Sequence, residues 1–277
     1  MVAGATEALE RTVASLRQTT PGAPVCCGVD LGTASIIVVV LGEGGVPLAC
    51  EMEPCRVARD GLIVDHLGAI RIVRRLTDRL RERLGADLGP AAIAVPPGTV
   101  PASASTHRHV AEAAGLEVTA VLDEPTAANA VLGLVDGAVV DIGGGTTGLS
   151  VFKGSRVMYV ADEATGGVHM NLVLMGRLGM TFEQAEAYKV DPVNADDVRQ
   201  AVRPVAEKMA SIAADHLAGC PVDQVWLVGG TAGLAGIEEV FADALGAPTA
   251  KPPHPMMVTP LGIARSVLRS CGEAVAA

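Results

Sequence analysis

Short apolar runs, most of them rich in β-branched residues, alternate along the chain with turn residues and longer amphipathic stretches. Runs of about four to eight such residues, bounded by glycine, proline or polar clusters, are typical of buried strands. These runs predict strands at residues 25–30, 36–41, 91–95, 118–122, 138–142, 149–152 and 225–228. Longer stretches of helical character predict helices at residues 6–17, 67–84, 105–114 and 182–189.

The strand predicted at 138–142 leads directly into a glycine- and threonine-rich segment that ends at Gly148. Glycines have no Cβ, so backbone N–H groups can close around an anion there, and threonine hydroxyls add further donors. Asp141, near the end of the strand, would present a carboxylate to a metal-bound phosphate. Taken alone, the segment is equally compatible with a glycine-rich hairpin turn.

A similar arrangement occurs near the start of the chain, where Asp30-Leu31-Gly32-Thr33 follows the first predicted strand. In both places an aspartate ends an apolar strand, glycine and threonine follow, and a second apolar strand leads into a turn. This is an internal repeat of strand, phosphate turn, strand and hairpin. Two such halves facing each other would clamp a nucleotide between two lobes.

The composition and charge of the chain argue against some kinds of binding partner. The chain has 277 residues, a formal net charge of −10 and a pI of about 5.0, which argue against a nucleic acid as the main partner. No apolar run approaches the roughly 20 residues needed to span a bilayer, and no secretory signal is apparent. We therefore expect a cytoplasmic protein without a membrane partner.

The cysteines do not form a metal-binding or redox motif, because none belongs to a CxxC pair. Small buried hydrophobic residues in a reducing compartment are the favoured interpretation over metal or redox chemistry. The six cysteines are Cys26, Cys27, Cys50, Cys55, Cys220 and Cys271.

A third acidic position follows the strand predicted at 118–122, where the sequence continues Asp123-Glu124-Pro125. Proline is well tolerated at a helix start, since its missing N–H would have no partner in the helix. Glu124 is therefore expected at the same sheet edge as Asp30 and Asp141. The alternative is an acid that simply caps the following helix.

Two other features are expected to be structural. The helix predicted at 67–84 has a row of six arginines, which we expect to be a solvated face more than a docking site. His107 and His109 are two residues apart on a helix and cannot face one metal ion together, so surface or capping roles are expected.

The N-terminal 24 residues combine a short helix with a proline- and glycine-containing linker. Leu9, Val13 and Leu16 form a narrow apolar stripe on this helix, which would suit a groove in another protein. A frayed terminus is the alternative. Because isolated helices of this length are marginal in water, we expect the free segment to be disordered or loosely packed.

Four motifs now stand in a fixed order: Asp30–Thr33, Glu124–Ala128, Asp141–Thr146 and Val228–Thr231. Together they resemble the motif set of the actin, sugar-kinase and Hsp70 ATPase superfamily. Within it, the chain from about residue 25 resembles the ethanolamine-utilisation chaperone-like family (EutJ). That likeness rests on the stretches 57–61, 122–127, 162–167 and 257–261. The resemblance implies an α/β, two-lobed actin-like ATPase fold of duplicated ribonuclease H-like domains, each with a five-stranded sheet.

The resemblance also implies roles for individual residues. Asp30 and Asp141 would hold Mg²⁺, through waters, because Mg²⁺ dehydrates reluctantly. Glu124 would position the attacking water, with Thr33 also in the catalytic set. Residues expected to contact ATP or ADP are Asp30, Gly32, Thr33, Ala34, Gly143, Gly144, Gly145, Thr146, Thr147, Glu186, Lys189, Gly229 and Gly230. Glu186 and Lys189 would lie beside the ribose, or else form a surface ion pair.

Some features depart from the Hsp70 pattern. Gly233 occupies the place of the arginine that stacks on adenine, and no lysine matches the phosphate-contacting lysine. The lysines, at 153, 189, 208 and 251, all fall in the second lobe. Slow ATP hydrolysis is therefore expected. An Hsp70-style clamp cycle is not expected, because the sequence shows no peptide-binding domain after the two lobes.

The predicted organisation is a segment at 1–24, a first lobe at 25–138 plus 256–277, and a second lobe at 139–255. The last helix, at 260–268, is expected to return to the first lobe. By resemblance, the protein would assist assembly, protection or reactivation of ethanolamine ammonia-lyase or its microcompartment, with which it would associate. A small-molecule kinase and an actin-like scaffold or filament former with little hydrolysis stay open as rivals, as does homo-oligomerisation.

Overall fold

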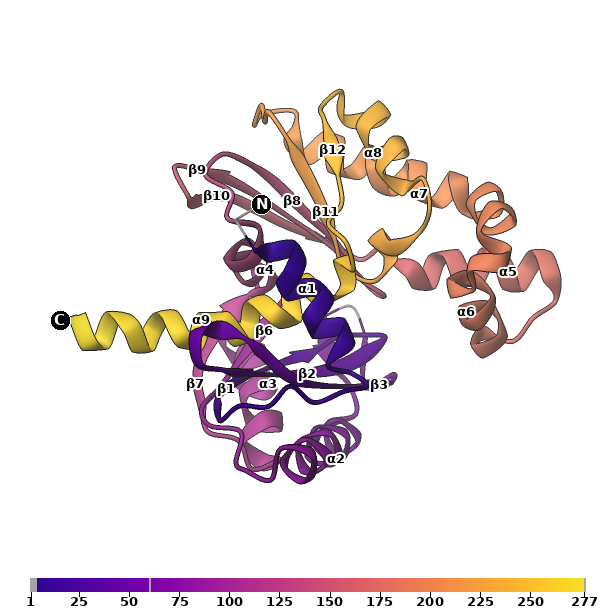
Figure 1. The fold of residues 1–277 in the computed structure, drawn as a ribbon. Helices are drawn as coiled ribbons and strands as arrows, with labels where there is room; N and C mark the ends of the chain where they lie inside the picture. Colours follow the sequence, from indigo (N-terminus) through magenta and orange to yellow (C-terminus); the bar gives the residue numbers. More distant parts are fainter. Residues whose placement is uncertain (1–3, 60, 277) are drawn as a thin grey trace. The chain divides into compact units, whose positions relative to one another are not determined.

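The computed structural model describes residues 4–59 and 61–276, with side chains described as far as residue 268. The chain divides into two units, the first made of Met1–Leu134 and Met257–Ala277 and the second of Val135–Met256 (Figure 1). Within the described residues, each unit contains a five-stranded sheet. The first 24 residues, expected as a separate segment, group with the first unit.

The sheet of the first unit has the strand order β3-β2-β1-β6-β7. Its strands are β1 (Pro24–Leu31), β2 (Ser35–Gly42), β3 (Pro47–Pro54), β6 (Ala91–Val95) and β7 (Val118–Asp123). The first three are antiparallel neighbours, whereas β1, β6 and β7 run parallel. Apolar residues of α2 (His66–Leu84) and α3 (Pro101–Ala113) pack on one face of this sheet to form its core. The short hairpin of β4 (Ala58–Arg59) and β5 (Leu62–Ile63) precedes α2.

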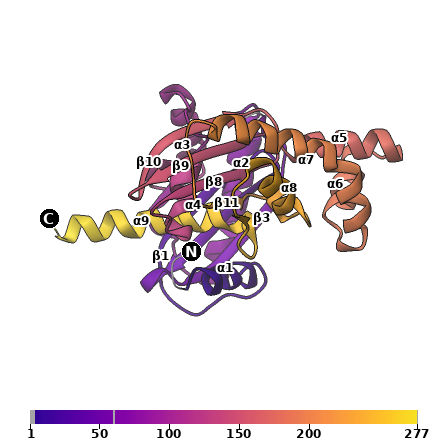
Figure 2. The same cartoon turned by 90° about the horizontal axis from the view of Figure 1, so that it is seen from above.

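The opposite face of the sheet is covered by α9 (Val258–Ala276), which itself packs on α4 (Glu124–Leu132) (Figures 1 and 2). Two glycines permit this packing. A Cβ on Gly28 would lie 2.4 Å from the Ala264 backbone nitrogen, and one on Gly262 would lie 1.8 Å from the Ala127 carbonyl oxygen. The predicted return of the last helix to the first lobe is therefore seen, with a helix that extends to Ala276.

The second unit repeats this plan with the strand order β10-β9-β8-β11-β12. Its strands are β8 (Gly137–Ile142), β9 (Thr147–Lys153), β10 (Arg156–Glu163), β11 (Val225–Val228) and β12 (Thr249–Ala250). The helices α5 (Gly167–Leu178), α6 (Phe182–Val190), α7 (Ala195–Leu217) and α8 (Ile237–Leu245) contribute to its core. In each unit the strands are arranged third, second, first, fourth and fifth in chain order, so the repeat predicted from two short motifs extends to the whole sheet.

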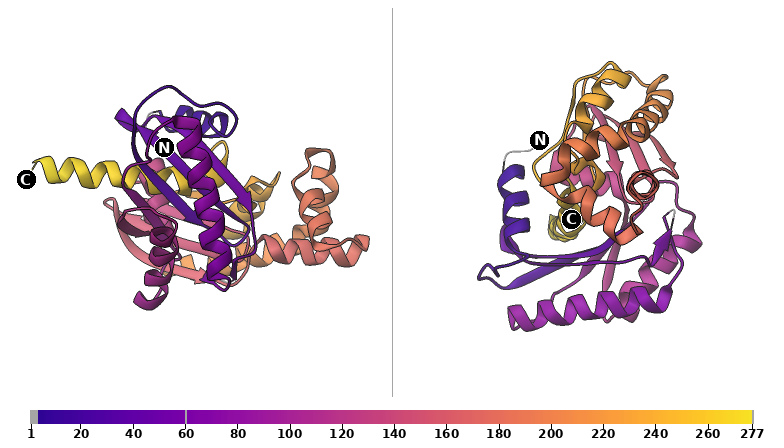
Figure 3. Two further views of the ribbon diagram at one scale, coloured as in Figure 1. Left: turned by 90° about the horizontal axis from the view of Figure 1, so that it is seen from below. Right: turned by 90° about the vertical axis from the view of Figure 1, so that its right-hand side faces the viewer.

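The N-terminal helix α1 (Ala5–Ala14) packs against β3 of the first unit (Figure 3). Leu9 is fully buried, and the Ser15 carbonyl accepts hydrogen bonds from the Cys50 backbone N–H at 3.2 Å and from Arg83 Nη2 at 2.7 Å. These contacts contradict the expectation of a loosely packed segment. The apolar stripe expected to enter a partner's groove packs in part on the protein's own sheet: Leu9 is buried, and Val13 and Leu16 are half-buried.

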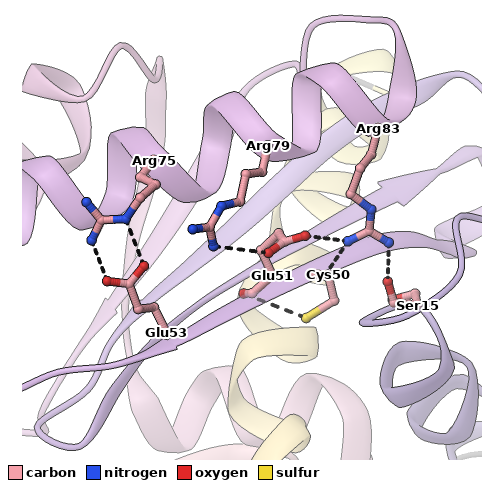
Figure 4. Close-up of polar contacts among 7 residues, drawn as sticks. All are labelled: Ser15, Cys50, Glu51, Glu53, Arg75, Arg79 and Arg83. Atoms are coloured by element: carbon pink, nitrogen blue, oxygen red, sulfur yellow. Dashed lines mark hydrogen bonds and ion pairs between the residues drawn. The ribbon is translucent and has the colours of Figure 1, made fainter.

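Three of the six arginines of α2 face two carboxylates on the edge strand β3 (Figure 4). Arg75 pairs with Glu53, and Arg79 and Arg83 both reach Glu51. Arg83 is only 22% exposed, and it donates to the Glu51 carboxylate at 2.6 Å as well as to two backbone carbonyls. The expectation of a solvated face holds for Arg75 and Arg79, which are exposed, and is wrong for Arg83, which is half-buried. The three arginines join α2, β3 and the end of α1.

The cysteines with described side chains fit the expected role of small hydrophobic residues. Cys26, Cys27 and Cys50 are buried, and Cys55 and Cys220 are half-buried. Burial raises the pKa of the Cys27 and Cys50 thiols to about 12, so both are neutral thiols at physiological pH. The expectation for Cys271 falls outside the described side chains.

His107 is buried, at 3% exposure, and its Nδ1 lies 2.8 Å from the Ser103 carbonyl oxygen one turn earlier on α3. The surface or capping role expected for this residue is wrong, whereas His109 is exposed. Desolvation by burial lowers the pKa of His107, because the charged imidazolium is disfavoured away from water.

This lowered pKa predicts a loss of stability in acid. Above about pH 6.5 the imidazole is neutral in both folded and unfolded chains. As the pH falls through that value, the unfolded chain binds a proton more readily than the folded one, so the free energy of unfolding decreases. His107→Gln should flatten this dependence between about pH 7 and 5, measured by urea denaturation at each pH. A matched change at the exposed His109 should leave the slope intact; equal slopes for wild type and His107→Gln would contradict the prediction.

Candidate functional site

The first predicted phosphate turn, Gly32–Ala34, connects β1 to β2 in the first unit. A Cβ on Gly32 would lie 2.8 Å from the Ser35 carbonyl oxygen, so the tight return of the backbone requires glycine. The Cys55 N–H donates to the Ala34 carbonyl at 3.0 Å and fixes the turn to the chain that leaves β3. Gly32 and Thr33 are half-buried and Ala34 is exposed, so the turn is accessible to a ligand.

Asp30 and Glu124 lie at the same edge of the first sheet. Because β1, β6 and β7 are parallel, their C-terminal ends meet at this edge; Asp30 is near the end of β1, and Glu124 follows β7 as the first residue of α4. The helix is capped by Asp123, whose carboxylate accepts from the Thr126 N–H and hydroxyl, both at 2.8 Å. The capping role considered for Glu124 is therefore filled by its neighbour.

The second predicted phosphate loop, Gly143–Thr147, connects β8 to β9 in the second unit. The Gly143 N–H donates to the Thr146 carbonyl at 2.9 Å, which closes the loop. On its other side, the Gly143 carbonyl accepts from the Gly167 N–H at 3.0 Å and from the Thr231 hydroxyl at 2.8 Å. The loop is thus held between the start of α5 and the segment after β11, independently of any ligand.

Asp141 lies at the carboxyl end of β8, where it is 8% exposed. It pairs in register with Val228 of the parallel strand β11, and Gly229 follows that strand with φ of +90°. A Cβ on Gly229 would lie 2.3 Å from Asp141 Oδ1, so the carboxylate occupies the space left by this glycine. Gly229, expected from the sequence to contact the nucleotide, accommodates the aspartate in the structure.

Glu186 and Lys189 form an ion pair of 2.7 Å on α6, but they differ in accessibility. The Lys189 side chain is only 6% exposed, and its Nζ also lies 3.4 Å from the Gly167 carbonyl oxygen. The Glu186 side chain is 41% exposed and also accepts from the buried Asn171 amide at 2.6 Å. The surface-pair alternative is wrong for Lys189, and Glu186 is the member that a ligand can reach.

Each unit therefore brings together its own half of the predicted residues. The first holds Asp30, the first turn and Glu124; the second holds Asp141, the second loop, the Glu186–Lys189 pair and Gly229–Gly230. The residues that support them were not among the expected contacts, although Thr231 lies in the fourth motif; they are Asp123, Gly167, Asn171 and Thr231. The sequence carried a signal for Gly167, which follows Gly166 in a glycine pair before a helix, but none for Asn171.

The donor set suits a water-rich magnesium site more than one made by protein ligands. Among the side chains that the structure describes, no group of three or more from histidine, cysteine, aspartate or glutamate is placed to hold a metal ion. Single carboxylates beside glycine turns fit Mg²⁺, which keeps several waters and is commonly bound by one or two carboxylates plus substrate phosphates. Within the same described part of the chain, every helix is too short or too polar to cross a bilayer.

The architecture of two repeated α/β units is shared with other known proteins. A family model for the type IV pilus assembly protein PilM matches residues 103–270, more than half of the chain. The structure of MreB5 of Spiroplasma citri bound to ADP has a TM-score of 0.72 at 16% identity, covering 91% of this chain and 98% of that one. The fold therefore belongs to the actin-like ATPase class.

Within this class, closer relatives define the family. The ethanolamine utilization protein EutJ of Escherichia coli K12 is 43% identical over 92% of each chain. The crystal structure of EutJ from Carboxydothermus hydrogenoformans has a TM-score of 0.87 at 42% identity, covering 94% of this chain and 98% of that one. The chain belongs to the EutJ family of ethanolamine utilization proteins. The chaperone HscA of Cronobacter sakazakii is 37% identical over 45% of this chain and 20% of its own length.

Proposed function

We propose that this protein binds ATP or ADP with Mg²⁺ and acts as a chaperone-like factor in ethanolamine utilisation. Its clients would be ethanolamine ammonia-lyase or components of the associated microcompartment, which it would help to assemble, protect or reactivate. The observation that carries the nucleotide proposal is the repeat: in each unit an aspartate near the end of the first strand leads into a glycine turn held by backbone contacts.

The turns would bind the phosphates through backbone N–H groups and threonine hydroxyls. Asp30 and Asp141 would hold water molecules of the hydrated Mg²⁺, whose charge offsets that of the phosphates. Gly229 and Gly230 would let the nucleoside approach the backbone closely, as glycines at such positions do. Glu186 would accept a hydrogen bond from the sugar, with Lys189 bracing it from the buried side.

Glu124 would orient the attacking water. Since Asp123 already caps α4, the Glu124 carboxylate is not required for the cap. Phosphoryl transfer of this kind depends mainly on placement and charge neutralisation. Turnover is proposed to be slow for two reasons. Gly233 replaces the arginine that stacks on adenine in Hsp70-like proteins, and no lysine matches their phosphate-contacting lysine.

Glu124→Gln is expected to bind ATP as tightly as the wild type and to lower the hydrolysis rate by about a hundredfold, within the usual range for a positioned base. The measurement is single-turnover release of phosphate from radiolabelled ATP, with binding followed separately by calorimetry. Asp123→Asn, which retains a capping side chain, serves as the matched control and should keep most of the activity. Phosphate release by Glu124→Gln at the wild-type rate would reject this role.

The cellular role is tested by affinity purification from cells growing on ethanolamine, with partners identified by mass spectrometry. Glu124→Gln should retain clients longer in ATP, because the bound state is not reset by hydrolysis. The rival scaffold function predicts a different result: sedimentable assemblies of the purified protein in ATP and no enrichment of ethanolamine ammonia-lyase or shell components.

A further inference from the structure

Asn171 is a fully buried polar residue on α5, behind the second loop. Its Nδ2 donates a 2.6 Å hydrogen bond to Glu186 Oε2, the same oxygen that accepts from Lys189 Nζ at 2.7 Å. Two donors from two helices therefore converge on one carboxylate oxygen. This fixes both the rotamer of Glu186 and the direction in which its other oxygen, Oε1, is presented.

The carbonyl oxygen of the Asn171 side-chain amide accepts no hydrogen bond from the described residues. This oxygen, Oδ1, is buried. A buried acceptor left without a donor is unfavourable, and a leucine of the same shape would avoid this cost. Stability alone therefore does not account for an asparagine at this position, and the remaining contribution of the amide is its bond to Glu186.

The ion pair of Glu186 and Lys189 is also linked to the second loop, through Gly167. Lys189 Nζ lies 3.4 Å from the Gly167 carbonyl oxygen. The Gly167 N–H in turn donates to the Gly143 carbonyl. A Cβ on Gly167 would lie 2.5 Å from the Thr231 hydroxyl and 3.1 Å from Lys189 Nζ, so this packing requires glycine. One residue thus links the carboxylate to the loop that would hold the phosphates.

We infer that Asn171 is a positioning residue that aims the Glu186 carboxylate at a sugar hydroxyl and so makes the site selective for ribonucleotides. The inference rests on the proposed nucleotide binding. With Oε2 occupied by Asn171 and Lys189, Oε1 is the oxygen available to accept from a ligand, and the vicinal hydroxyls of ribose are donors of the required kind. A deoxyribose would leave this partly desolvated acceptor without its full set of donors.

The test compares the affinities of ATP and 2′-deoxy-ATP, each with Mg²⁺, by isothermal titration calorimetry on the full chain. The wild type should favour ATP by about tenfold, roughly one charge-assisted hydrogen bond. Asn171→Leu should reduce this ratio to nearly one while leaving the melting temperature of the nucleotide-free protein unchanged or higher. Asn171→Asp, which keeps the shape but places a second carboxylate beside Glu186, should lose the selectivity as well and remains informative if the leucine variant does not fold.

A wild-type ratio preserved in both variants would overturn the inference, whatever their melting temperatures, because a purely structural asparagine would alter stability and not sugar selectivity. A wild type that binds ATP without preferring it over 2′-deoxy-ATP would overturn the inference and leave the proposed function standing. A wild type that binds neither nucleotide would reject the proposed function itself.

Discussion

Replacing Gly262 with alanine is expected to lower the free energy of unfolding by about 3 kcal/mol, the upper end of the usual cost of overpacking. The added Cβ would lie 1.8 Å from the Ala127 carbonyl oxygen and 2.6 Å from its carbonyl carbon. Both are backbone atoms of α4, so no side-chain rotation relieves the clash, and α4 and α9 must separate. Since domains are stabilised by only about 5–15 kcal/mol in total, this single methyl group should have a large effect.

Urea denaturation followed by circular dichroism measures this change. The matched control is Gly176→Ala on α5, where a Cβ would meet nothing within 4 Å and the helical backbone suits alanine. This control should be neutral or stabilising by up to about 1 kcal/mol. Wild-type stability of Gly262→Ala would mean that α4 and α9 do not pack this closely.

The second large effect is expected at Asp141, where alanine should abolish the stabilisation of the protein by Mg·ATP. At a ligand concentration of 100 times Kd, binding adds about 2.7 kcal/mol to the free energy of unfolding, and a variant that does not bind gains none of it. The Asp141 carboxylate lies against the gap left by Gly229, so Gly229→Ala should displace it and weaken binding too. Asp215→Ala, at an exposed position on α7, is the control and should retain the wild-type shift.

The parts of the fold that sequence predicted well are those set by local pattern. The strand–turn–strand repeat was visible because an aspartate near the end of a strand and the following glycine are separated by only one residue in both copies. The helix at 67–84 is predictable because its apolar spacing is a local signal, and in the structure it is α2 (His66–Leu84).

Other features depend on contacts between distant segments, and no local pattern encodes them. Whether Lys189 is exposed depends on how α5 packs over α6, so a ribose contact and a surface ion pair are equally compatible with the sequence. Whether Arg83 faces solvent depends on the register of β3 beneath α2, which places Glu51 under it. The burial of Leu9 likewise requires β3 as its partner. In each case the sequence shows the side chain and its neighbours on one helix, but the segment that covers that side chain comes from elsewhere in the chain.

Calorimetric titration of the intact protein with Mg·ATP shows whether the repeated aspartate–glycine turns bind a nucleotide. We predict saturable binding to one site per chain, weakened when EDTA removes Mg²⁺ and lost in Asp141→Ala. The absence of binding heat at millimolar ATP, together with a melting temperature that ATP does not change, would show that these turns do not bind nucleotide.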